Sequence, residues 1–238
     1  MTSKRERTRE RILETALGLF RKRGFDATTM RDIAAAAGMA LGAAYYHFRS
    51  KEALVMAYYE RNQSAHEAAA HARFAQASDV TARLAAAFHS KLDVLSRDRK
   101  LLGAVFRSAG DPDDPLSVFG SGTAGLRDRS TAIFAEALAP LGLPSATAEV
   151  LARALWLAHL GLLLYFLHDR SRGQARTRRL VDELVGLFAP ALTFAGSPGF
   201  APVIARVIGA MDRARPPERP SARAKNKRGS GEGRSGSA

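Results

Sequence analysis

The sequence of 238 residues predicts an all-α protein. Apolar residues recur every three or four positions, the spacing of an amphipathic helix, from near the N-terminus to about residue 214. No stretch shows the strict alternation of apolar and polar residues that a half-buried strand needs. Glycine, proline and capping residues divide the chain into segments of ordinary helix length. These three observations together favour an all-helical fold.

The first helix is expected from about residue 8 to residue 22. Ile12, Ala16 and Phe20 form an apolar stripe along one side of this segment, and Gly24 ends it. Residues 1–10 are rich in Lys and Arg, which predicts a basic arm that contacts phosphates or enters a minor groove. A solvated start of the first helix is the alternative interpretation of the same charges.

The next two helices are short and flank Gly38. One is expected over about 30–37, where Thr29, followed three residues later by Asp32, predicts a capping box. Gly38 stands where the end of a helix favours a left-handed residue. The other helix is expected over about 41–48. Two helices joined by a short glycine-containing turn are the layout of a helix-turn-helix, which indicates a DNA-binding domain.

A fourth helix is expected from Ser50, a capping residue, to about residue 77. Its sequence changes near Arg61 from an apolar face to a polar and alanine-rich one, so we place the domain boundary inside this helix. The predicted domains are a helix-turn-helix domain over 1–60 and a second helical domain over 61–215. A rigid helix shared by two domains can transmit movement between them.

The second domain is expected to be helical throughout. Its helices are separated by the DPDDP turn at 111–115 and by prolines and a glycine at 140–144, and Ser145 or Thr147 is expected to cap the helix that follows. The approximate helix ranges are 80–95, 101–106, 123–139, 145–168, 175–194 and 202–213. Residues 216–238 lack apolar periodicity and are expected to form a disordered basic tail, either solvated or adding nonspecific affinity for DNA.

Residues 8–58 resemble the DNA-binding domain of TetR-family transcriptional regulators. The matching positions fall in three blocks, one on each of the first two helices and one from the third helix into the fourth. They are Ile12, Ala16, Leu19 and Phe20; Gly24, Phe25, Thr28, Thr29, Ile33, Ala34 and Gly38; and Gly42, Tyr45, Tyr46, His47, Phe48, Lys51 and Leu54. The family usually has Ser or Thr at Ala40 and Leu or Ile at Ala44. The third helix is therefore expected to lack a side-chain N-cap, at a cost of about 1 kcal/mol.

The candidate DNA-binding residues lie on the second, third and fourth helices. Leu41, Gly42 and Ala43 are small enough for the third helix to approach base edges, but they provide no side-chain donors. Arg31, on the exposed face of the preceding helix, is the candidate for direct contact with a guanine. The resemblance implies that the remaining candidates contact phosphates. These are Thr29, Tyr45, Tyr46, His47 and Lys51.

The helix over 145–168 is apolar nearly all round, so it must be buried on more than one side. The resemblance implies that the segments 145–169 and 175–194 form a homodimer interface; the alternative is the central core helix of a monomer. A two-fold pair of reading heads suits a palindromic double-stranded DNA operator. A cavity for a small apolar or amphipathic effector is expected beside the first of these helices. The candidate lining residues are Phe88, Phe106, Phe134, Trp156, His159, Leu163 and Tyr165.

Composition excludes several other classes of protein. Cysteine is absent, so no disulfide or thiolate chemistry is available. The six histidines show no spacing typical of a metal site, and no catalytic residues or cofactor are predicted. The N-terminus lacks the apolar core of a signal peptide, and the apolar, uncharged run over 154–168 is shorter than the roughly 20 residues of a membrane span. A cytoplasmic protein without a membrane partner is therefore expected.

The net charge of +13 suggests a polyanionic partner, but residues 213–238 alone carry eight basic and two acidic residues. We predict a dimeric transcriptional repressor that a small effector releases from its operator. One alternative is an enzyme built around Gly120, Gly122 and Gly125, which fit a dinucleotide motif but lack the required strand before them; a loop beside a pocket is the simpler interpretation. The other alternative is nonspecific compaction of nucleic acid by the basic tail. Neither the regulated genes nor the direction of control follows from the sequence.

Overall fold

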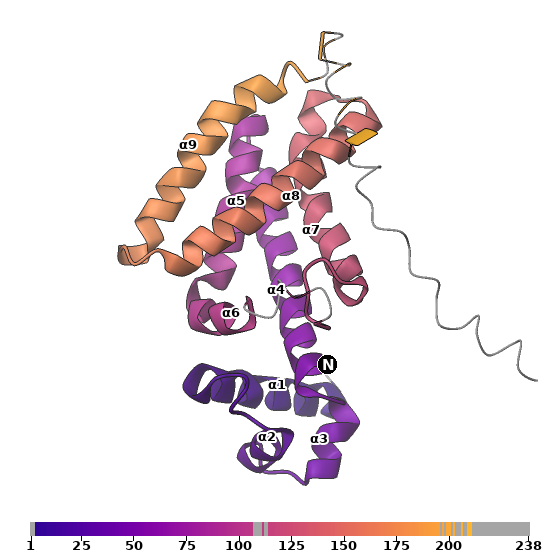
Figure 1. Ribbon diagram of the computed structural model, residues 1–238, viewed down its shortest axis with the longest axis vertical. Helices are drawn as coiled ribbons and strands as arrows, with labels where there is room; N and C mark the ends of the chain where they lie inside the picture. Colours follow the sequence, from indigo (N-terminus) through magenta and orange to yellow (C-terminus); the bar gives the residue numbers. More distant parts are fainter. Residues whose placement is uncertain are drawn as a thin grey trace, which may run out of the picture.

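The computed structural model describes residues 3–106, 111, 114–195, 197, 199–200, 202, 206 and 209–210. Every regular element within these residues is an α-helix or a short 3-10 helix, and they contain no strand, which confirms the all-α prediction. Figure 1 shows helices α1, α2 and α3 grouped at one end of the molecule and α5 to α9 at the other. Helix α4 runs from the first group into the second (Figure 1).

The helix bounds agree with the predicted order, with shifts of a few residues at some ends. The α-helices are α1 Lys4–Arg23, α2 Met30–Ala36, α3 Leu41–His47, α4 Lys51–Phe74, α5 Val80–Leu95, α6 Arg99–Phe106, α7 Ala124–Leu138, α8 Ser145–His168 and α9 Ala175–Leu192. Short 3-10 turns cover Ser96–Asp98, Ser121–Thr123, Ala139–Leu141 and Arg172–Gln174. The weak helix predicted over 202–213 and the tail over 216–238 lie mostly or wholly outside the described residues.

Helix α1 starts earlier than predicted, and the basic segment 4–10 is part of it rather than an arm. The hydroxyl of Ser3 accepts a hydrogen bond from the Glu6 amide, and the Glu6 carboxylate accepts one from the Ser3 amide, which completes a capping box. A helix that begins at Lys4 places Arg5, Arg7 and Arg9 on regular helical turns. Only residues 1 and 2 lie outside the described part of this segment.

The turn between α2 and α3 forms by the predicted capping chemistry. Thr29 and Asp32 make a reciprocal capping box at the start of α2. Gly38 has φ of 66°, and the Met39 amide donates to the carbonyl of Ala34 at 3.0 Å, the bonding pattern of a Schellman motif. Ala40 makes no side-chain cap for α3, as expected. The short turn fixes the angle at which α3 leaves α2.

Helix α4 connects two separate hydrophobic cores. Its first half packs Leu54, Val55 and Tyr58 against α1, while Ala70 and Phe74 belong to the core of the larger helical group. Ser50 caps α4 through a bond from the Ala53 amide, at 3.2 Å. Leu101 of α6 is buried in the N-terminal core, so the second domain also contacts the first through α6.

The larger core forms where α5, α7 and α8 meet, and α9 packs along α5. Phe134 and Phe166 are among its fully buried side chains. Pro144 occupies the N-cap position of α8 without a side-chain cap, so the predicted caps by Ser145 or Thr147 do not form. Of the three glycines of the dinucleotide-like motif, Gly120 and Gly122 lie at the start of and within a 3-10 helix, and Gly125 lies in the first turn of α7; no strand precedes them in the described residues.

By length and mean hydropathy α8 is the one described helix that could cross a membrane, a possibility that the count of uncharged residues alone did not reveal. Part of its surface belongs to the core of the helical domain, since Ala152, Trp156 and Phe166 are buried there. The core helix of a water-soluble protein has the same composition, so this property is weak evidence for a span.

Candidate DNA-binding surface and internal cavity

Helix α3 presents a surface of small residues at the end of the molecule farthest from the larger core (Figure 1). Gly42 and Ala43 are exposed, Leu41 is half-buried, and Ala44 is the residue through which α3 packs on the N-terminal core. Such a surface lets a helix backbone approach the floor of a major groove closely. Arg31 on α2 is also exposed.

Both tyrosines of α3 face solvent. Tyr45 is 46% and Tyr46 is 71% exposed, so neither forms part of the N-terminal core. The guanidinium of Arg5 lies 5.7 Å from the centre of the Tyr46 ring, and the ring of His47 packs edge-on against the same tyrosine at 5.2 Å. The start of α1 therefore adds a cation beside the exposed ring of Tyr46, which suits contact with a phosphate.

Two of the predicted phosphate ligands already have partners within the protein. The hydroxyl of Thr29 donates to Asp32 Oδ2 at 2.6 Å while it accepts from the Asp32 amide. The ammonium of Lys51 donates to the carbonyl of Phe25 at 2.9 Å and lies over its ring at 4.5 Å. The Lys51 contacts hold the turn between α1 and α2 against the start of α4, and the Thr29 bonds stabilise the start of α2.

A cavity of about 120 Å³ lies inside the larger helical group, beneath the loop that precedes α7. Three of the predicted lining residues, Trp156, His159 and Leu163, border it. Val118 and Thr123 of the loop cover one side, and Thr123 fixes the loop by donating to the carbonyl of Ser117 at 2.6 Å. The full lining comprises Tyr59, Asn62, Gln63, Lys91, Leu95, Leu102, Val118, Thr123, Leu126, Arg127, Ser130, Trp156, His159, Leu160 and Leu163.

The remaining predicted pocket residues are not among the described residues that line this cavity. Phe88 and Phe134 pack against each other with ring centres 5.1 Å apart. Both rings also contact the ring of His159, and neither residue borders the cavity. Tyr165 is 45% exposed on the outer side of α8. Phe106 ends α6, and its side chain lies outside the described residues.

The polar end of the cavity was not predicted as part of the pocket. It consists of Asn62 and Gln63 from α4, Lys91 from α5 and His159 from α8. Burial lowers the pKa of Lys91 to about 8, because desolvation disfavours its charged form. Burial likewise holds the pKa of His159 well below its usual value, so its imidazole is neutral at pH 7. The sequence signal was a lysine within the apolar stripe of α5.

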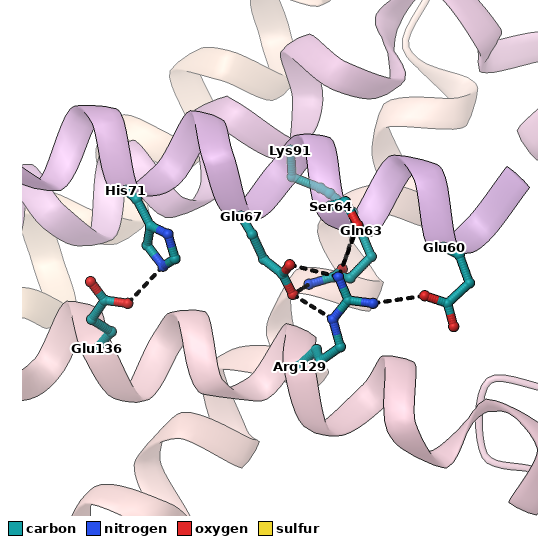
Figure 2. A network of polar contacts seen from close by, with 8 residues as sticks. All are labelled: Glu60, Gln63, Ser64, Glu67, His71, Lys91, Arg129 and Glu136. Atoms are coloured by element: carbon teal, nitrogen blue, oxygen red, sulfur yellow. Dashed lines mark hydrogen bonds and ion pairs between the residues drawn. The ribbon is translucent and has the colours of Figure 1, made fainter. Parts of the chain in front are cut away.

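Figure 2 shows the polar network that joins this end of the cavity to the domain-spanning helix. The ammonium of Lys91 donates to Gln63 Oε1 at 3.2 Å, and Gln63 Nε2 donates to Glu67 Oε1 at 3.2 Å. Arg129 of α7 binds Glu67 in a two-pronged pair at 2.6 and 2.8 Å, and it reaches Glu60 at 2.7 Å. The network therefore connects α5, α4 and α7.

A further polar connection joins the N-terminal domain to the larger domain. Asp98, after α5, accepts two bonds from Arg21 of α1, at 2.6 and 2.9 Å. Together with Leu101 of α6, this ion pair fixes α1 against the larger domain. A change in the position of α6 would therefore act directly on the helix-turn-helix domain.

The outer faces of α8 and α9 carry large apolar side chains that the described residues leave exposed. Leu187 and Phe188 on α9 are 67% and 55% exposed, and Leu157 and Leu164 on α8 are nearly half exposed. Exposed apolar surface is typical of sites where proteins associate.

Both domains match models of a known protein family. Residues 12–58 match the family described as bacterial regulatory proteins, tetR family, and residues 83–199 match the tetracyclin repressor-like C-terminal domain. The chain is 41% identical over 101 residues to the probable HTH-type transcriptional regulator ArpR of Pseudomonas putida, which is 42% of each protein. It is 50% identical over 54 residues to the HTH-type transcriptional repressor KstR2 of Rhodococcus jostii, covering 23% of this chain and 26% of that one.

The chain thus spans less than half the length of these curated relatives. Among solved structures, a TetR transcriptional regulator from Nitrosomonas europaea has the same fold, with a TM-score of 0.62 at 22% identity over 76% of this chain and 97% of that one. The matched models describe regulatory proteins, which confirms the prediction that this chain is not an enzyme. From its helix-turn-helix domain and its helical C-terminal domain, both matched, the chain belongs to the TetR family of bacterial regulatory proteins.

Proposed function

We propose that this chain is a cytoplasmic, dimeric transcriptional repressor that a small effector releases from a palindromic DNA operator. The observation that supports the proposal is the exposed surface of α3, with Tyr46 and Arg5 beside it. This surface directly precedes α4, a helix that borders the internal cavity. The relative named KstR2 is described as a repressor, which favours repression over activation.

On DNA, α3 would lie in the major groove with Gly42 and Ala43 near base edges. Tyr45, Tyr46 and His47 would bind phosphates, and exposed Arg31 would contact a base. Thr29 and Lys51, whose polar atoms are already engaged, would act chiefly by holding this surface in shape. Their proposed contribution to DNA affinity is therefore indirect.

Dimerisation would bury the apolar side chains on the outer faces of α8 and α9, including Leu157 and Phe188. A two-fold dimer places two α3 helices on successive major grooves, roughly 34–36 Å apart. An effector in the cavity would favour a dimer with a different spacing. Movement would pass through α4 and through the contact of α6 with α1, because α4 and α6 both border the cavity and both contact α1.

A mobility-shift assay on the DNA upstream of the chain's own gene tests this function. The expected result is retardation of that DNA at protein concentrations that leave unrelated DNA free, with two chains per site. Arg31→Ala should relax base preference, while Tyr46→Phe should weaken binding to every sequence alike. If the upstream DNA and unrelated DNA bind equally, the proposal of a specific operator fails.

A further inference from the structure

The cavity wall contains cations and no acid. Lys91 and Arg127 border it, and no carboxylate is present among the described lining residues. Arg127 is occupied by the loop, since it donates to the carbonyls of Val118 and Gly120 at 3.0 and 3.3 Å. Lys91 is only 9% exposed, and its nearest acidic neighbour, Glu67, is bound to Arg129 instead. Lys91 therefore carries a buried positive charge without an ion-pair partner in the described part of the chain.

Two further buried side chains border the same cavity with unused polar atoms. Asn62 Nδ2 has no hydrogen-bond partner, and neither ring nitrogen of His159 has one. Asn62 is 9% and His159 is 2% exposed, so solvent does not satisfy these atoms either. Because the ring of His159 is neutral, one of its nitrogens is a donor. Lys91, Asn62 and His159, each with a polar group able to donate, thus border one cavity, and Lys91 is bound there only to Gln63 Oε1.

Unsatisfied buried donors cost free energy unless a ligand supplies acceptors. The rest of the wall is apolar and includes Leu95, Trp156 and Leu163. The volume of about 120 Å³ is close to that of an engineered cavity of about 150 Å³ that holds benzene. A ligand that fits has a small apolar body and an end with several acceptors.

We propose that this cavity binds a small amphipathic carboxylate, similar in size to benzoate, with its charged end against Lys91, Asn62 and His159. The inference rests on the proposed function, because it names the chemical class of the effector. The carboxylate would compete with Gln63 for the ammonium of Lys91. Since Gln63 also binds Glu67, this exchange alters the network along α4, the helix that enters the DNA-binding domain.

Isothermal titration calorimetry of the full chain at pH 7 tests the assignment with benzoate and hexanoate and their neutral amides, benzamide and hexanamide. Wild-type protein should bind the acids at least tenfold more tightly than the amides. Lys91→Met should abolish this preference, whereas Lys22→Met, which removes an exposed lysine of α1, should keep it. His159→Phe, a second variant, should weaken acid binding more than amide binding.

Two results would overturn the assignment. One is the absence of binding for either acid up to about 10 mM, both as heat in the titration and as a rise in the melting temperature. The other is equal affinity for the acids and their amides. Loss of acid selectivity in Lys22→Met as well would remove the role given to Lys91. Retardation of operator DNA is measured on the same preparation without ligand. DNA binding without carboxylate binding refutes this inference alone, while carboxylate binding without DNA binding refutes the proposed function alone.

Discussion

Replacing Lys91 by methionine should remove a rise in stability that the wild-type protein shows above pH 8. Burial lowers the pKa of this lysine from 10.5 to about 8, whereas the unfolded chain keeps the ordinary value. Below pH 8 both states carry the proton, and the folded state bears the full cost of a buried charge. Between the two pKa values the unfolded state binds more protons, so the free energy of unfolding rises with pH.

The slope is about 1.4 kcal/mol per pH unit, which gives the wild type about 2 kcal/mol of added stability between pH 8 and pH 9.5. Other charged or titratable groups near this lysine are Glu67 and Arg129, His66 and His159, all present in both proteins. Urea unfolding of wild type and Lys91→Met at several pH values therefore isolates the lysine. Loss of the bond to Gln63 shifts the variant by a constant amount. Parallel stability curves over pH 7–9.5 would refute the reasoning.

Four further predictions concern the rest of the molecule. Asp98→Asn should weaken the ion pair between Asp98 and Arg21 of α1. Operator affinity without ligand should change little, whereas the loss of affinity caused by a carboxylate ligand should be smaller than in the wild type. An equal loss of affinity in variant and wild type would contradict this. Phe188→Glu should yield monomers in sedimentation experiments and lower operator affinity, and a persistent dimer would exclude that face as the interface. Tyr46→Phe should lower affinity for all DNA without altering its salt dependence, because no charge is lost. Asp169→Asn should lower stability by about 1–3 kcal/mol at pH 7, as measured by urea unfolding, because Asp169 accepts bonds from Thr177 at 2.8 and 2.9 Å; no loss would exclude a structural role.

The stability from Asp169 should also depend on acidity. Although burial raises the pKa of this carboxyl, hydrogen bonds from Ser171 and Thr177 hold it well below its usual value. The contribution is therefore fully present above about pH 4 and is lost as the pH falls towards the folded-state pKa. Asp169→Asn should make the free energy of unfolding depend less steeply on pH in that acidic range.

Local chemistry explains why the helix-turn-helix was predictable from sequence. Thr29, Asp32 and Gly38 act within a few residues of themselves, so their capping roles are encoded in the spacing. The early start of α1 had a signal of the same kind, Ser3 followed by Glu6, but the basic charges of this segment favoured an arm instead. Ser145 and Thr147 failed as caps because Pro144 already stands at the N-cap position.

The cavity could be predicted only in part, because five helices, α4 to α8, and the loop before α7 form it from distant parts of the sequence. Trp156, His159 and Leu163 share one face of α8, so helical spacing placed them together. Phe88 and Phe134 occupy positions of the same pattern but face the core, and Tyr165 faces outward. The meeting of Lys91 with Asn62 and Gln63 depends on how α4 packs against α5, and no local spacing encodes that contact.

In the proposed function, two copies of this chain bind one operator through paired α3 helices, and a ligand in the cavity ends this binding. A fluorescence anisotropy titration of labelled upstream DNA, with and without benzoate, tests it most directly. We expect the DNA to be saturated at two chains per site and to be released on addition of benzoate, with no release in Lys91→Met. Saturable binding of one chain per site, or binding that no cavity ligand or cavity substitution alters, would contradict it.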